Sequence, residues 1–592
     1  MRGADYIFKF LADKGARHVF MVTGGGAMFL NDAVRAEQRL TPIFNQHEQA
    51  SAIAAEGYVR AGNGIGVVNA TTGPGGTNTL TGVIGQWLDS IPVIYISGQV
   101  KFETTILSCA APVPRQLGDQ EINIVDIVRP VTKYAAVVTD PRALRRELEK
   151  AFALAYAGRP GPVWLDIPIN VQNTEVSEDT MLPEDAFTPP PQPIPTENEI
   201  ASVLAALAIA KRPAIIAGHG IRLAGACDAF LALVDQLNIP VLTTFNGFDL
   251  IPSEHPCFAG RIGTLGNRCG NFVLQSADLL LSIGSRNNVR QISYNWENFG
   301  KQAKKIVVDI DPAELRKPTL KPDLGIHADA DAFISMLARA LVLAPLPPKA
   351  EWLAWSQERR ARFPVVPPYT PCPGIVDAYA FAATLSKAVS ADTPIIAGNG
   401  TACVALFQSG HVKPGHRLFW NSGCASMGYD LPAALGAAVG GKKAVCIAGD
   451  GSIQMNLAEL QTVLNHRLAV KIFLLDNNGY ASIRQTQNGF FDGQKIGCDP
   501  DSGLGLPDML KIATAYGYRT AVIDDESRME TVIDEVMRGN DPVLCVVRLG
   551  ENTFAPKLSS RKLPDGSIVS PSLEDMFPFL PEAEVQANIL EN

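Results

Sequence analysis

The chain has 592 residues, a formal net charge of −9, and a composition of 46% hydrophobic and 19% charged residues. Its length predicts about three or four domains, and its composition is typical of a globular protein that is neither disordered nor fibrous. An acidic balance without a basic block argues against nucleic acid and against an anionic membrane surface as partners.

No segment of the sequence predicts export or membrane insertion. Residues 1–15 are amphipathic and lack the apolar core of a signal peptide, and the longest apolar stretch, 201–210, is too short to span a bilayer. The ten cysteines are scattered, without a CxxC pair or a neighbouring histidine cluster. We therefore expect reduced, buried cysteines in a soluble cytoplasmic enzyme.

Residues 1–175 form the first predicted domain. A segment of helical period, 6–14, is followed by three strand-like segments that each end in a turn, at 18–26, 64–78 and 90–99. Strands that alternate with helices predict a parallel, doubly wound sheet. The turns contain the clusters GGG, GPGG and SGQ, and each cluster alone is more simply explained by a tight turn than by a binding loop.

Glu48 is the most informative residue of this domain. It stands in FNQHEQASAIAAEGYVR, just before a predicted helix faced with Ala and Ile. Small apolar surroundings remove water from a carboxylate, so we expect desolvation of Glu48. The simpler alternative is a first-turn glutamate that the helix dipole favours.

A proline-rich stretch, TPPPQPIPT at 188–196, marks a domain boundary. The second predicted domain, 190–345, alternates again, with strand-like segments at 212–222, 239–247, 276–286 and 304–312. Gly218-His219-Gly220 follows the first of them and is only a weak dinucleotide-binding signal. The residues leave two interpretations open, a structural spacer or a nucleotide-binding domain.

The third predicted domain, 365–550, contains the segment around which the chain is organised. Two buried strand-like runs, VCIA and VKIFLLD, flank an amphipathic segment and end in GDG at 449–451 and NNG at 477–479. Open α/β sheets bind ligands at the carboxyl ends of such strands. Free N–H groups at Gly449 and Gly451 suit a diphosphate, while Asp450, Asn477 and the Gly479 carbonyl suit Mg²⁺ or Ca²⁺. Ordinary turn chemistry explains either tripeptide taken alone.

The two motifs with this spacer resemble the cofactor signature of thiamine-diphosphate (ThDP) enzymes. Over nearly its whole length the chain most closely resembles acetolactate synthase (acetohydroxyacid synthase) large subunits. The resemblance implies an α/β fold of three doubly wound parallel-sheet domains: a pyrimidine-binding domain, a central FAD-binding domain and a diphosphate-binding domain. It also implies Mg²⁺ and a homodimer or homotetramer, because in the family the halves of the ThDP site meet across a dimer interface.

The resemblance assigns roles residue by residue. Glu48 is expected to be catalytic, together with Gly26 and Gln120, and to hydrogen-bond the aminopyrimidine ring. Met427 is expected to support the bent cofactor, and the Ala425 carbonyl to receive its 4′-amino group. The expected ThDP-binding residues are Gly25, Glu48, Gly75, Asn78, Asn399, Gly400, Ala425, Met427, Gly449, Gly451, Ser452, Asn477, Tyr480 and Ala481. The expected metal ligands are Asp450, Asn477 and Gly479. The expected FAD-binding residues are Arg159, Gly218, His219, Gly220, Thr244, Gly284, Arg286, Arg290, Asp311 and Asp329.

The implied reaction is decarboxylation of a 2-oxo acid, with pyruvate as the expected donor, and transfer of the acyl unit to a second carbonyl compound. The departures from acetolactate synthases fall on the acceptor side: Thr486 replaces a tryptophan, Asp119 replaces an aromatic residue, and Thr23-Gly24 replaces Tyr-Pro. We therefore expect an altered acceptor, such as a keto sugar.

Two other classes of function stay open. One is a ThDP-dependent decarboxylase or C–C bond hydrolase, although the chain lacks the adjacent histidines of the pyruvate decarboxylase type. The other is a non-catalytic homologue, which the intact Glu48, Asp450 and Asn477 disfavour. The turn-rich tail, 551–592, is expected either to fold back over the sheet or to cap the site.

Overall fold

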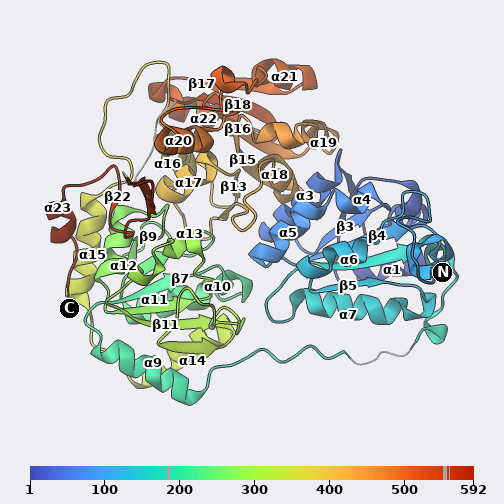
Figure 1. Cartoon of the computed structure of the whole chain (residues 1–592), viewed down its shortest axis with the longest axis horizontal. Coiled ribbons are helices and arrows are strands. Elements are labelled where there is room, and N and C mark those ends of the chain that lie inside the picture. The colour runs from blue at the N-terminus through green and yellow to red at the C-terminus, as the bar shows by residue number, and fades with distance from the viewer. Residues whose placement is uncertain (183–186, 551–556, 559, 564, 592) are drawn as a thin grey trace.

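The computed structural model describes residues 1–182, 187–550, 557–558, 560–563 and 565–591; the first residues of the expected tail, 551–556, lie outside this description. Three six-stranded sheets occur in succession along the chain, and each is parallel and flanked by helices (Figure 1). This confirms the predicted α/β class. Parallel neighbours need a crossover connection, which explains the regular alternation of strand and helix.

The N-terminal sheet has the strand order β2-β1-β3-β4-β6-β5. Its strands are β1 (His18–Met21), β2 (Thr41–Phe44), β3 (Gly66–Ala70), β4 (Val93–Gln99), β5 (Tyr134–Val137) and β6 (Val163–Pro168). Its helices are α1 (Gly3–Asp13), α2 (Met28–Ala36), α3 (Glu48–Arg60), α4 (Pro74–Thr77), α5 (Leu80–Asp89), α6 (Ile124–Val128), α7 (Leu144–Tyr156) and α8 (Ile169–Asn173). Strands β3, β4 and β6 are buried at every position, as expected for a sheet covered on both faces.

The middle sheet has the order β12-β11-β10-β7-β8-β9, which is the doubly wound order of dinucleotide-binding domains. Its strands are β7 (Pro213–Ala217), β8 (Val241–Thr243), β9 (Phe258–Arg261), β10 (Leu279–Ile283), β11 (Lys304–Asp309) and β12 (Leu324–His327). Its helices are α9 (Glu197–Ile209), α10 (Gly220–Leu223), α11 (Cys227–Leu237), α12 (Arg268–Ser276), α13 (Val289–Ile292), α14 (Ala330–Leu343) and α15 (Ala350–Arg362).

The C-terminal sheet has the order β14-β13-β15-β16-β18-β17, so it repeats the order of the N-terminal sheet strand for strand. Its strands are β13 (Ile395–Ala397), β14 (Leu418–Phe419), β15 (Lys443–Gly449), β16 (Ala469–Asp476), β17 (Arg519–Ile523) and β18 (Val543–Arg548). Its helices are α16 (Ala378–Ala388), α17 (Thr401–Ser409), α18 (Asp430–Ala438), α19 (Glu459–Asn465), α20 (Ala481–Phe490), α21 (Met509–Tyr516) and α22 (Met529–Met537).

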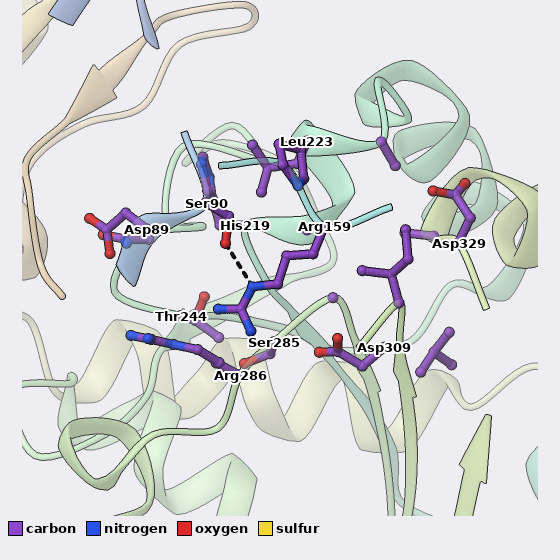
Figure 2. Close-up of a pocket in the computed structure, with 18 of the residues that line it drawn as sticks. Asp89, Ser90, Arg159, His219, Leu223, Thr244, Ser285, Arg286, Asp309 and Asp329 are labelled. Carbon is purple, nitrogen blue, oxygen red and sulfur yellow. Dashed lines mark hydrogen bonds between the residues drawn. The ribbon is translucent and has the colours of Figure 1, made fainter. Parts of the chain in front are cut away.

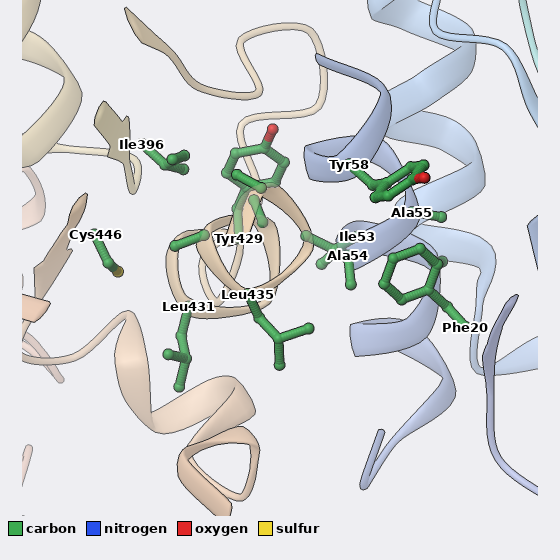
Figure 3. Close-up of a cluster of buried hydrophobic side chains, with 14 of the residues drawn as sticks. Phe20, Ile53, Ala54, Ala55, Tyr58, Ile396, Tyr429, Leu431, Leu435 and Cys446 are labelled. Carbon is green, nitrogen blue, oxygen red and sulfur yellow. The ribbon is translucent and has the colours of Figure 1, made fainter. Parts of the chain in front are cut away.

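Helices α3 and α18 join the N-terminal and C-terminal sheets through one shared hydrophobic core (Figure 3). Their backbones lie unusually close together. An ideal Cβ on Gly57 would lie 2.1 Å from the Ala433 carbonyl oxygen, and one on Gly436 would lie 1.9 Å from the Ala54 oxygen. Only glycine fits at both crossing positions, so these small residues set the distance between the two domains.

The described residues of the C-terminal tail pack on the middle domain, and a role of the tail in capping the site stays a prediction. Its described elements are β19 (Lys557–Leu558), β20 (Arg561–Lys562), β21 (Ile568–Val569), β22 (Met576–Phe577) and α23 (Glu582–Ala587). Asn271 and Gln275 of α12 donate hydrogen bonds to the Leu573 carbonyl at 3.0 Å and to Glu574 at 2.7 Å. The tail therefore folds back over α12, although Lys557 also reaches Gln485 of α20.

All ten cysteines are free. Six of them are buried, as the sequence predicts, whereas Cys372 is exposed in the segment before the third domain. Among the residues with described coordinates, none of the helices is both long and apolar enough to cross a membrane.

Candidate functional site

The strand order of the C-terminal sheet reverses between β13 and β15. A ligand-binding crevice is expected beyond the carboxyl ends of the strands at such a reversal. β13 leads into Gly398-Asn399-Gly400, and β15 ends at Gly449 and leads into Asp450 and Gly451. The structure thus brings the predicted diphosphate loops to the position where this topology binds ligands.

Asp450 organises this crevice. Its Oδ1 accepts the backbone N–H of Gly451 at 2.7 Å, and its Oδ2 accepts those of Asn477 at 3.1 Å and Gly479 at 2.9 Å. One carboxylate therefore joins the GDG and NNG motifs. Burial raises the pKa of Asp450 to about 6, although these hydrogen bonds act in the opposite direction. A cation beside this carboxylate would favour its charged form.

Asn477 offers an unused acceptor next to Asp450. Its Oδ1 is buried and has no hydrogen-bond partner within the described part of the chain, which is unusual for a buried amide oxygen. An ideal Cβ on Gly451 would lie 2.1 Å from the Tyr480 ring, so only glycine fits there. A carboxylate, an amide oxygen and backbone groups fit a hard divalent cation shared with a diphosphate. No cluster of three or more His, Cys, Asp or Glu side chains suited to a metal occurs in the described residues.

The loop before α18 carries Ala425 and Met427 along the same crevice. Asn421 accepts the N–H of Ala425 at 3.1 Å, and Ala425 has a φ of +54°. Asn399 donates its side-chain amide to the Ser426 carbonyl at 2.7 Å, which ties this loop to the one after β13. Met427 is 40% exposed. An apolar side chain is thereby left available to support a ligand.

The far end of this loop is anchored to the GDG motif. The Gly428 N–H donates to the Ser452 hydroxyl at 2.9 Å, and that hydroxyl donates to Asp430 at 2.6 Å. Burial raises the pKa of Asp430 to about 6. Sequence reasoning missed Asp430, because its context, Tyr-Asp-Leu-Pro, carries no binding signal.

The segment after NNG fixes the start of α20. Tyr480 precedes this helix, Ala481 is its first residue and is buried, and Arg484 donates to the Asn477 carbonyl at 2.8 Å. Thr486 is exposed, and its hydroxyl bonds back to the carbonyl one turn earlier at 3.0 Å. The helix therefore leaves the surface around Thr486 open.

Glu48 begins α3, directly after the edge strand β2. It is half-buried and accepts a hydrogen bond from the Asn78 amide at 3.0 Å, so the structure brings two predicted ThDP residues together. The fully desolvated acid of this helix is Glu56, which is bonded to Arg60 at 2.8 Å. Burial raises the pKa of Glu56. In the single chain Glu48 is only partly buried, whereas α3 is buried from Ala50 to Tyr58, and the expected desolvation of Glu48 stays a prediction.

Other predicted ThDP residues lie near the crevice of the N-terminal domain. Gly25 and Gly26 follow β1, and Gly75 follows β3, where the order of the N-terminal sheet reverses. Gln120 is exposed and has a φ of +57°, and its carbonyl lies so close to Gly73 that a Cβ there would be 2.4 Å away. In the described residues, the side-chain hydrogen bonds of Glu48 stay in this domain and those of Asp450 stay in the C-terminal domain.

A cavity of about 380 Å³ opens at the carboxyl ends of β7 and β10, where the middle sheet reverses its order (Figure 2). This volume is in the range of small-molecule sites. The predicted FAD residues that line it are Arg159, His219, Gly220, Thr244, Gly284, Arg286 and Asp329. Gly218, Arg290 and Asp311 are not part of the lining.

Arg290 and Asp311 have other partners. The Arg290 guanidinium lies over the Phe245 ring, 5.2 Å from its centroid, and Asp311 accepts a hydrogen bond from Arg159 at 3.0 Å. Arg286 and Arg290 are four residues apart in the sequence. They do not share a helix face, because α13 begins only at Val289.

Asp309 occupies the lining position that the sequence suggested for Asp311. It is the last residue of β11, and burial raises its pKa to about 6. The sequence signal was present, since DIDP places two acids at the end of a strand. Asp309 still belongs to β11, whereas Asp311 lies two residues beyond the end of the strand and pairs with Arg159.

His219 indicates that this cavity suits a polar ligand. Both of its ring nitrogens are buried and find no partner among the described residues. Burial, together with nearby arginines, keeps the pKa of His219 well below its usual value. A neutral imidazole without a partner fits a ligand that supplies the missing hydrogen bonds.

Comparison with known proteins points to one family. The descriptions that match are thiamine pyrophosphate enzyme, N-terminal TPP binding domain, over residues 1–125; central domain, over 200–337; and C-terminal TPP binding domain, over 398–547. The chain is 31% identical to the acetolactate synthase isozyme 1 large subunit of Escherichia coli (strain K12), over 92% of this chain and 94% of that protein.

Two further relatives are similar over the same extent. A probable acetolactate synthase large subunit of Methanocaldococcus jannaschii is 31% identical, over 92% of this chain and 91% of its own length. The acetolactate synthase large subunit of Lactococcus lactis is 29% identical, over 93% of each chain.

Proposed function

Since the chain belongs to the thiamine pyrophosphate enzymes, we propose that it is an acetolactate synthase-like carboligase. It would remove CO₂ from pyruvate and join the remaining acyl unit to a second carbonyl compound. The observation that carries the proposal is Asp450, whose carboxylate joins the GDG and NNG motifs beside the unpaired Asn477 oxygen.

ThDP, when bound, supplies the nucleophilic carbon and accepts the electron pair released with CO₂. The protein would bind and orient it. Asp450, Asn477 and the Gly479 carbonyl would hold Mg²⁺, and the backbone N–H groups of the glycine loops would hold the diphosphate. Glu48, oriented by Asn78, would hold a proton at the edge of the aminopyrimidine ring.

A second copy of the chain would complete this site. Glu48 and Asp450 have no hydrogen-bonded connection among the described residues, and large apolar side chains are exposed near both halves, including Phe44 at 42% and Met455 at 48%. Exposed apolar groups of this kind support an interface. We therefore propose a homodimer or homotetramer, which sedimentation can distinguish from a monomer.

FAD is the proposed occupant of the middle-domain cavity. The strand order, the cationic Arg286 and the unpaired His219 support it. Protein reconstituted with FAD and then dialysed should retain flavin absorption, and Arg286→Ala should weaken retention about tenfold. Arg290→Ala is the control, because Arg290 does not line the cavity. Loss of all flavin from the unmodified protein would contradict this assignment.

An acceptor other than pyruvate is a second proposal. The exposed Thr486 and the exposed Asp119 support it, because both stand where the related family has aromatic groups. An open, polar surface would suit a larger polar carbonyl compound such as a keto sugar.

One incubation tests both proposals. Enzyme, ThDP, Mg²⁺ and pyruvate are combined with and without a series of carbonyl acceptors, and the products are separated. Release of CO₂ with the acyl unit joined to an acceptor supports the carboligase, whereas free acetaldehyde as the main product indicates a decarboxylase. Acetolactate as the only efficient product would contradict the altered acceptor.

A further inference from the structure

Asp89 forms part of the wall of the middle-domain cavity, although it is the last residue of α5 in the N-terminal domain (Figure 2). Its side chain is 1% exposed and accepts a hydrogen bond from Arg60 at 2.7 Å. It also accepts the backbone N–H groups of Ser422 and Gly423, each at 3.0 Å. Asp89 therefore lines the cavity as a residue, while its buried carboxylate holds the 421–428 loop.

The contact between α5 and the 421–428 loop is closely packed. An ideal Cβ on Gly423 would lie 2.6 Å from Leu88 and 2.7 Å from the Asp89 carboxylate. An ideal Cβ on Gly85 would lie 2.2 Å from the Asn421 amide. Because no space remains between them, a shift at the end of α5 must also move the loop.

The 421–428 loop connects its close contact with α5 to the proposed ThDP residues. Asn421 accepts the N–H groups of Cys424 at 3.2 Å and Ala425 at 3.1 Å. These bonds hold Ala425 at its positive φ of +54°, a strained conformation for alanine. The loop therefore needs external support to keep this conformation.

The cavity side of α5 has its own fixed partners. Ser90 follows Asp89, also lines the cavity, and accepts a hydrogen bond from Arg159 at 2.9 Å (Figure 2). Arg159 in turn donates to Asp311 and Glu314 of the middle domain, each at 3.0 Å. A ligand in the cavity would thus contact Arg159, Ser90 and Asp89, which connect two domains.

We propose that Asp89 is a positioning residue that couples occupancy of the middle-domain cavity to the ThDP site. A dinucleotide in the cavity fixes the end of α5, and Asp89 then fixes the 421–428 loop in the conformation that receives the aminopyrimidine. The inference rests on the proposed function, because it takes FAD and ThDP as the two ligands. By linkage, each ligand must tighten binding of the other by the same factor.

Calorimetry of the flavin-free and the FAD-saturated protein tests the coupling. FAD should lower the Kd of ThDP with Mg²⁺ about tenfold in the unmodified protein. In Asp89→Asn, which keeps the shape but removes the charge, the factor should fall to within about twofold.

Asp249→Asn is the matched control for this experiment. Asp249 is also fully buried, pairs with Arg222 and Arg417, and accepts the Leu418 N–H at 3.1 Å. It does not line the cavity. This variant should keep the tenfold factor even if it is destabilised.

Hydrogen exchange on the unmodified protein provides a test that does not depend on the folding of a variant. FAD alone, without ThDP, should slow exchange of the Cys424 and Ala425 amides, which do not line the cavity. The Leu418 amide, bonded to Asp249, should be unaffected.

The possible outcomes separate the two proposals. An equal ThDP Kd with and without FAD, or unchanged exchange at Cys424 and Ala425, overturns the coupling. Failure of FAD to bind also overturns it, while ThDP binding and acyl transfer would stand. Failure of ThDP to bind contradicts the proposed function itself and removes the coupling with it.

Discussion

The N-terminal and C-terminal sheets share one strand order but differ in the chemistry of their loops. In the C-terminal sheet, the loops at the reversal of strand order contain the acid Asp450 between two glycines. In the N-terminal sheet, the equivalent loops contain glycines without an acid, and Glu48 follows an edge strand instead. Topology therefore places a crevice in each domain, and the loop residues set the different chemistry of the two crevices, for which we propose a metal-bound diphosphate and a neutral ring.

The largest expected effect removes the acid of the N-terminal half. Glu48→Gln should lower the rate of acyl transfer from pyruvate about 10²–10⁴-fold, because an amide cannot hold the proton at the ring. ThDP affinity should change little, since Asn78 and the diphosphate loops remain. Steady-state rates and calorimetry check this. Glu197→Gln, in the exposed first turn of α9, should leave both unchanged.

The second change removes the acid of the C-terminal half. Asp450→Asn should weaken binding of ThDP with Mg²⁺ by about 10–100-fold, because a charged ligand is lost and the amide keeps only one of the two acceptor oxygens that join the motifs. The neighbouring Asp476→Asn is the control, since Asp476 pairs with Arg548 rather than with the crevice. Equal losses in both variants would contradict a specific metal role for Asp450.

The third change affects the contact between α3 of the N-terminal domain and α18 of the C-terminal domain. Gly57→Ala places a Cβ 2.1 Å from the Ala433 oxygen, and such overpacking should lower the free energy of unfolding by about 1–3 kcal/mol. Gly489→Ala, on a helix position with nothing within 4 Å, should be neutral or raise stability by up to about 1 kcal/mol. Denaturant unfolding of both variants measures the difference, and equal stabilities would show that α3 and α18 can separate freely.

The smallest expected effect is a pH dependence of stability that comes from Asp166. This buried acid lies on β6 of the N-terminal sheet, outside the proposed cofactor loops. It accepts hydrogen bonds from Ser97 at 2.5 Å and Gln99 at 3.1 Å, and burial raises its pKa to about 7. The folded state thus keeps a proton that the unfolded state releases near pH 4. Stability should therefore fall as pH rises through this window, by about 1 kcal/mol between pH 6 and 7.

Asp166→Asn should abolish this part of the pH dependence. Thermal unfolding of both proteins at several pH values between 5 and 8 checks it, and the difference between them isolates Asp166 from other titrating groups. Parallel curves for the two proteins would show that Asp166 is already ionised in the folded state at pH 6.

The interior strands and the cofactor loops could be predicted from the sequence. Strands such as β4, β10 and β15 are buried along almost their whole length, so they appear as continuous apolar runs that end in a glycine turn. The edge strands were not predicted. β5, β12 and β17 are short and partly exposed, so no continuous apolar run marks them.

The sequence by itself determined the parallel α/β class, the glycine loops and the acids Glu48 and Asp450, because these are local patterns in which spacing and residue type carry the signal. Only the tertiary structure decided that Asp309 rather than Asp311 lines the cavity, since it sets where β11 ends and which partner Asp311 finds. It also placed Asp89 between the cavity and the 421–428 loop. These two segments lie more than 300 residues apart on the chain, and only long-range packing brings them together.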